Sequence, residues 1–113
     1  MAYDESLATR ISKFFSSRGV PAVSKAMMGG LVFMVDDKMC VGVHRNSLLA
    51  RIDPEEQAEA LARKGCSRME FTGRPMRGFV LIDPSVLKTE AQLKSWLDAA
   101  LAFNPKAKAS KRK

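Results

Sequence analysis

The sequence is poor in the side chains that most often perform catalysis. It contains one histidine, one tryptophan, one tyrosine and two cysteines among 113 residues. On a regular strand, Cys40 and His44 would share a face with their backbones roughly 13 Å apart, too far to bind one zinc ion together. Two cysteines and one histidine also fall short of the four ligands of a structural zinc site. We therefore expect no metal, no cofactor and no enzymatic activity, with Cys40 in the core and His44 at a strand end.

The sequence also lacks an export signal and a long hydrophobic run. The first ten residues show no basic start followed by an apolar segment, and the longest uncharged apolar stretch covers only residues 26–35. That stretch is half the length that a bilayer-spanning helix needs. We expect a cytoplasmic protein without membrane contact, whose cysteines are reduced thiols. A chain of this length suits one domain with a single core.

Acidic residues are absent from the last ten positions, where basic residues gather. The net charge is +7, and five of these charges belong to residues 105–113, which we predict to be a disordered tail behind a domain of residues 1–104. Such a tail either binds DNA or RNA weakly, without sequence preference, or only keeps the protein soluble. The tail residues that would contact nucleic acid are Lys106, Lys108, Lys111, Arg112 and Lys113.

Three segments have the apolar spacing of amphipathic helices. The first segment covers residues 4–18, and Asp4 at its start is a candidate N-cap. Residues 53–65 begin with a capping-box pattern formed by Asp53 and Glu56, and a third helix begins at Thr89 with Gln92 in the same relationship. These patterns predict helices near the two ends of the chain and one in its middle.

Runs rich in valine, leucine, phenylalanine and methionine separate these helices. Residues 25–35 and 39–44 flank an acidic turn, residues 48–52 form a third run, and residues 69–71 and 77–82 follow the middle helix. Short turns between adjacent strands favour antiparallel pairing. We predict a two-layer α+β domain, an antiparallel sheet flanked by helices, in the order helix, three strands, helix, two strands, helix.

Two glycine-containing segments are candidates for a binding surface. A strand follows Met28-Gly29-Gly30, where a phosphate loop requires a helix N-terminus, so these glycines are better explained by a bulge or a close approach within a strand. The loop 72–78 holds two arginines that either grip a carboxylate or phosphate or are simply solvated. Methionines near both segments suit an adaptable protein interface as well as a core. The candidate surface comprises Lys25, Met28, Gly29, Gly30, Arg51, Arg74, Met76 and Arg77.

Four stretches occur in the same order as in a known family. They are YDESLATRISKFFSSRG, KAMMGGLVFMVDDKMCVGVH, FTGRPMRGFVLIDP and WLDAALAFN, and together they span residues 3–104. The sequence resembles the N-terminal domain of the TfoX/Sxy proteins, bacterial regulators of competence genes. One difference is Met28, where the family usually has an aromatic residue before the glycines. Longer members carry a second domain, whereas this chain continues into the basic tail, so we expect a stand-alone N-terminal domain.

The resemblance implies a small α+β fold of the kind also seen in secretion chaperones. It also implies a non-enzymatic role in transcription regulation, because TfoX-like proteins act with the cyclic-AMP receptor protein at competence promoters. We therefore expect a regulatory or adaptor domain that binds a protein of the transcription machinery. Two alternatives stay open: non-specific nucleic-acid binding through the tail, and binding of a small anion by Arg74, Arg77 and Lys25.

Overall fold

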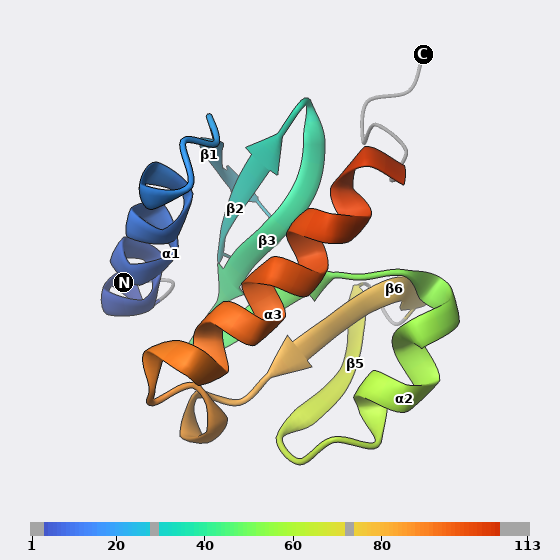
Figure 1. The fold of residues 1–113 in the computed structure, drawn as a ribbon. Helices are drawn as coiled ribbons and strands as arrows, with labels where there is room; N and C mark the ends of the chain where they lie inside the picture. Colours follow the sequence, from blue (N-terminus) through green and yellow to red (C-terminus); the bar gives the residue numbers. More distant parts are fainter. Residues whose placement is uncertain (1–3, 28–29, 72–73, 107–113) are drawn as a thin grey trace.

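The computed structural model describes residues 4–27, 30–71 and 74–106 of the chain, and in these ranges a single antiparallel sheet lies against helices (Figure 1). The chain begins with helix α1 (Glu5–Ser17), followed by four strands: β1 (Val23–Met27), β2 (Gly30–Val35), β3 (Lys38–His44) and β4 (Ser47–Arg51). A 3₁₀ turn (Pro54–Glu56) and the short helix α2 (Gln57–Leu61) precede β5 (Cys66–Phe71) and β6 (Arg74–Ile82). A 3₁₀ turn (Pro84–Val86), helix α3 (Glu90–Phe103) and a last 3₁₀ turn (Asn104–Lys106) complete the described ranges.

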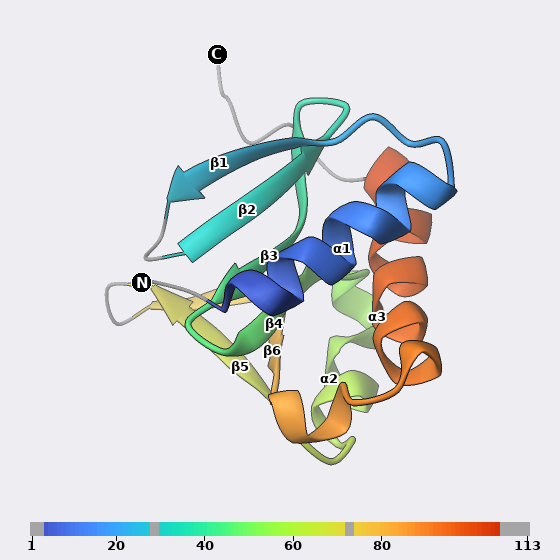
Figure 2. The same cartoon turned by 90° about the vertical axis from the view of Figure 1, so that its left-hand side faces the viewer.

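The six strands form a single sheet in the order β1-β2-β3-β4-β6-β5, with every neighbouring pair antiparallel. The helices lie together on one side of this sheet (Figure 2). The predicted α+β class, with an antiparallel sheet and helices as a second layer, is therefore confirmed.

The structure contains one strand more than predicted before α2. The apolar run 25–35 is divided into β1 and β2, which pair with each other from Val23↔Met34 to Met27↔Gly30. The chain therefore reverses direction between Met27 and Gly30. The uninterrupted apolar sequence concealed this reversal, because periodicity alone does not distinguish one long buried strand from two shorter paired ones.

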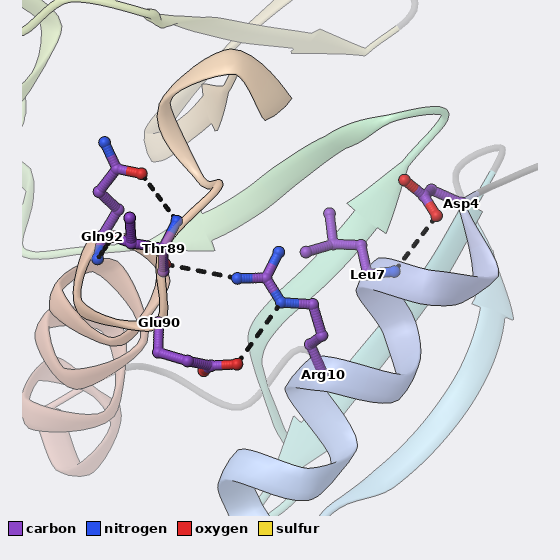
Figure 3. Close-up of polar contacts among 6 residues, drawn as sticks. All are labelled: Asp4, Leu7, Arg10, Thr89, Glu90 and Gln92. Carbon is purple, nitrogen blue, oxygen red and sulfur yellow. Dashed lines mark hydrogen bonds and ion pairs between the residues drawn. The ribbon is translucent and has the colours of Figure 1, made fainter.

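The two predicted capping boxes have different outcomes. At Thr89 the hydroxyl accepts from the Gln92 N–H at 3.1 Å and the Gln92 side chain accepts from the Thr89 N–H at 3.0 Å, so this box is confirmed (Figure 3). At Asp53 the carboxylate instead accepts from the Glu55 N–H, which begins a 3₁₀ turn, and α2 is only five residues long. Asp4 caps α1 as predicted, accepting from the N–H of Leu7 at 3.2 Å.

The main core lies between the helices and the sheet. Helices α1 and α3 each direct one apolar stripe inward, as their spacing predicts. Burying a side chain such as Ile11 or Leu97 completely contributes about 1.5–3 kcal/mol. The stripes are formed by Leu7, Ile11, Phe14 and Phe15 on α1 and by Leu93, Trp96, Leu97 and Ala100 on α3. Within the described ranges, no helix combines the length and the apolar character needed to cross a bilayer.

Candidate binding surface on the sheet

The face of the sheet that points away from the helices carries its own apolar cluster. Along β2, Val32 and Met34 alternate with Phe33 and Val35, which belong to the main core, so the two sets lie on opposite faces. No helix in the described ranges covers this face, yet the cluster residues are only 2–8% exposed. We call them the second cluster: Val32, Met34, Met39, Leu49 and Phe79, with Leu81 packed against them.

Arg51 borders the second cluster at the end of β4. It is paired with Phe79 on β6, and its guanidinium carbon lies 5.3 Å from the centroid of the Phe79 ring. Burial lowers the pKa of Arg51, but an arginine so placed keeps its charge near neutral pH. The predicted site residue Arg51 is therefore a half-buried cation stacked on an aromatic ring of this face.

Lys25 lies on the same face of the sheet but on a different strand from Arg51. It is the cross-strand partner of Val32, so its side chain is directed to the side of the second cluster. Strands β2 and β3 separate it from β4 in the sheet, and a further strand separates it from β6. Lys25 is exposed, and it lines a hollow together with Val23 and Met34.

Gly30 and Gly42 mark points where β2 and β3 approach each other too closely for a side chain. A Cβ on Gly30 would collide with the carbonyl oxygen of Val43, and one on Gly42 would lie 2.7 Å from the carbonyl oxygen of Leu31. The interpretation of Gly30 as a close approach within a strand agrees with this geometry. Met28 and Gly29, the other members of that motif, lie outside the described residues.

The arginine-containing loop belongs in part to a strand. Arg74 is the first residue of β6, paired with Phe71, and Pro75 is paired with Glu70. Strand β4 joins β6 only from Phe79 onward, so Pro75 has β5 as its neighbour and needs no hydrogen bond on its other side. The backbone of Met76 and Arg77 continues β6, whereas the side chains of residues 74–77 lie outside what the structure describes.

The basic tail begins at a well-defined anchor. Asn104 is buried, and Lys106 is exposed at the end of the last 3₁₀ turn. The remaining predicted nucleic-acid contacts, Lys108, Lys111, Arg112 and Lys113, lie outside the described residues. The structure therefore locates the start of the tail beside the β2–β3 turn, where Lys38 donates to the carbonyl of Asn104.

Cys40 and His44 do not share a face of β3, contrary to the sequence prediction. The β2–β3 register shifts so that Phe33 is paired with Val41 and Met34 with Met39, which leaves Cys40 as an extra residue. This bulge directs Cys40 into the main core, whereas His44 follows the core residue Val43 and lies on the opposite face. Burial raises the pKa of the Cys40 thiol to about 12, so it stays protonated near neutral pH.

A groove between α1 and the start of α3 is a feature that sequence reasoning missed. Arg10 donates to the carbonyl of Thr89 at 3.4 Å and lies 3.9 Å from the Glu90 carboxylate (Figure 3). Around these contacts lies a hollow of about 690 Å³. Because Arg10 and Thr89 are 79 positions apart in sequence, no local pattern could indicate it. Its lining consists of Ser6, Thr9, Arg10, Lys13, Phe14, Ser17, Glu90 and Lys94.

Among residues 4–27, 30–71 and 74–106, no group of three or more histidine, cysteine, aspartate or glutamate side chains is arranged to hold a metal ion. The described site is thus an apolar sheet face with basic residues at its margin. A family model described as the TfoX N-terminal domain matches residues 15–104 of the chain. A comparison with curated proteins gives no match, and a comparison with solved structures gives none either.

Proposed function

The chain belongs to the TfoX N-terminal domain family, and from this membership we propose that it is a non-enzymatic regulatory domain that binds a protein partner in transcription control. The single observation that carries the proposal is the family match over residues 15–104. This family is linked to competence regulation, so the partner belongs to the transcription machinery. The domain then acts through a surface rather than through a reaction.

The helix-free face of the sheet supports a role in protein binding. The second cluster itself is buried, so the accessible part of this face is its margin, where the half-buried Arg51 guanidinium lies over Phe79. Arginine is enriched among the residues that contribute most to protein interfaces, and its planar guanidinium both stacks on aromatic rings and offers several hydrogen-bond donors. Arg51 is therefore the residue whose loss should weaken partner binding.

Affinity capture from the native host tests this proposal. The tagged protein should recover a component of the transcription machinery, and deletion of its gene should change the expression of a defined set of genes. Arg51→Gln should reduce the captured amount severalfold. Arg63→Gln is the matched control, since Arg63 also lies over an aromatic ring, 4.1 Å from the centroid of Trp96, but on the helix side. Capture of no transcription-related protein, together with unchanged expression, would refute the proposal.

A second candidate function is non-specific nucleic-acid binding by the tail. The charge distribution favours it, because five of the seven net positive charges lie beyond Asn104. Replacing Lys108, Lys111, Arg112 and Lys113 by glutamine should then weaken a DNA gel shift and reduce its salt dependence by a slope of about 0.9 per lost phosphate contact. Unchanged DNA binding by this variant would show that the tail residues do not contact DNA.

A further inference from the structure

Strand β1 forms an open edge of the sheet. It stands first in the strand order and is paired with β2 alone, so its outer side presents backbone N–H and C=O groups that no strand engages within the described ranges. Four consecutive residues, Val23 to Ala26, are exposed on both faces of the strand. Val23 is 61% exposed, which is unusual for a valine and makes it the most accessible large apolar side chain among the described residues.

One hollow is lined by residues of β1, and a second is lined by Ala22, directly before this strand. On the helix-free face, a hollow of about 520 Å³ is lined by Val23, Lys25, Met34 and the acidic β2–β3 turn, which stands beside β1 in Figure 2. On the helix side, a hollow of about 220 Å³ lies between α1 and the sheet and is lined by Phe15, Ala22 and Phe33 among others. Successive side chains of an added strand would point alternately toward these two hollows.

We propose that the outer edge of β1 binds an extended segment of a partner protein as a seventh strand, and that this segment carries an acidic, an apolar and a basic residue in succession. The proposal rests on the protein-binding function proposed above and adds a second contact surface at β1, separate from the one at Arg51, together with the chemistry of the bound segment. Main-chain hydrogen bonds to β1 supply the affinity, and the three side chains supply the specificity.

The charges beside β1 determine this order of side chains. Lys25, exposed in the middle of the strand, attracts a carboxylate placed opposite it. On the added strand, the residue two positions after this carboxylate lies opposite Val23. A long basic side chain there packs its stem on Val23 and Met34 and brings its charge near Asp37. Asp36 is already 3.9 Å from the Lys38 ammonium, so Asp37 is the more available partner. The intervening side chain faces the helix-side hollow, where the apolar side chains of Phe15, Ala22 and Phe33 lie beside Ser12 and Ser16.

A second copy of the chain fits this edge poorly. If two β1 strands were paired antiparallel about their centres, Lys25 of one copy would lie opposite Lys25 of the other. Like charges directly opposite each other destabilise strand pairing, and an edge lysine is a common means of preventing self-association. The same residue therefore disfavours a homodimer through β1 and selects an acidic partner residue.

The test uses the synthetic peptide acetyl-Ser-Thr-Glu-Val-Arg-Thr-Ser-amide and the isotope-labelled full chain. Nuclear magnetic resonance titration should give saturable shifts centred on the amides of residues 22–27 and 34–37. Lys25→Glu should weaken binding by about fivefold to tenfold, and a peptide with lysine in place of its glutamate should restore affinity to this variant. Lys88→Glu, at an exposed position on the loop before α3, is the charge-matched control and should bind as the wild type does.

Methylation of the peptide backbone distinguishes strand addition from simple charge attraction. N-methylation at one set of alternate residues should abolish binding, while methylation at the other set should leave it nearly unchanged, because only one set donates to β1. Equal effects of both sets, absence of saturable shifts, or self-association through β1 would overturn the proposal. Capture of a transcription partner equally by wild type and Lys25→Glu would overturn only this inference and leave the proposed function intact.

Discussion

Asn104 donates a hydrogen bond from its side-chain amide to the carbonyl oxygen of Val35, at a distance of 3.2 Å. This contact joins the end of α3 to the end of β2 across 69 positions of sequence. Among the described residues, Asn104 is the one polar residue that is buried. Its backbone carbonyl accepts a hydrogen bond from the Lys38 ammonium at 3.3 Å. The end of α3 and the β2–β3 hairpin are thus joined at Asn104.

Replacement of Asn104 by alanine should lower the free energy of unfolding by about 1–3 kcal/mol, because the buried carbonyl of Val35 would lose its partner. Urea denaturation followed by circular dichroism measures this change. Asn46→Ala, at an exposed turn position, should change stability by less than about 0.5 kcal/mol. Equal losses in the two variants would show that the Asn104 contact is not stabilising.

Gly42→Ala should destabilise the domain by about 2 kcal/mol or more, because the added methyl group would lie 2.7 Å from the carbonyl oxygen of Leu31 in a central strand. Gly19→Ala is a useful comparison. Gly19 has open space around its Cβ direction but a φ of +67°, so alanine there should cost only about 1–2 kcal/mol of backbone strain. Thermal unfolding ranks the two, and a smaller loss for Gly42→Ala would contradict the close approach of β2 and β3.

Asp37→Gly should stabilise the domain by about 0.5–1 kcal/mol. Asp36 and Asp37 both have positive φ values, +58° and +64°, in the two-residue turn between β2 and β3. Glycine adopts this left-handed conformation without the steric cost that an aspartate bears, and an Asp-Gly sequence is the preferred form of such a turn. A higher midpoint of thermal unfolding is expected. A lower one would indicate that the Asp37 carboxylate itself stabilises the fold.

Cys40 should make the domain less stable in alkaline solution. Burial raises the pKa of its thiol from 9.0 to about 12, so above pH 9 the unfolded chain releases a proton that the folded chain keeps. The stabilisation is complete below pH 9 and is lost as the pH rises toward 12, at up to about 1.4 kcal/mol per pH unit.

Denaturation of the wild type and Cys40→Ala at pH 8 and pH 10.5 isolates this contribution. At pH 8 the wild type should be the more stable protein, because alanine leaves a small cavity in the core. At pH 10.5 this advantage should shrink or disappear. An advantage that is independent of pH would show that the thiol ionises equally in both states.

Local signals predicted much of the fold. The N-caps at Asp4 and Thr89 and the inward stripes of α1 and α3 were recognisable because each depends on residues within one or two helical turns. The division of the run 25–35 into two strands was not, since residues 26–35 contain no polar side chain and Gly29-Gly30 was interpreted as a feature within one strand. The bulge at Cys40 was equally hidden, because it is defined by the partner strand and not by β3 alone.

The candidate site likewise combines features that the sequence predicted with features that only the folded structure shows. The sequence assigned Lys25 and Arg51 to one candidate surface with Arg74 and Arg77, and its motifs identified the family. It could not state that β4 is the neighbour of β6, which brings Arg51 onto Phe79, or that β1 is an edge with Lys25 at its centre. The groove at Arg10 and Thr89 could not be predicted either, because it exists only where helix α1 packs beside the start of α3.

The sequence by itself thus determined the starts of α1 and α3, their apolar faces, the charge of residues 105–113 and the membership of the TfoX N-terminal domain family. Only the tertiary structure decided which strands are neighbours, on which face Cys40 and His44 lie, and which strand edge is open. The physical reason is the range of the interactions. Caps and stripes are formed by residues close in sequence, whereas strand order and edges result from hydrogen bonds and packing between distant segments.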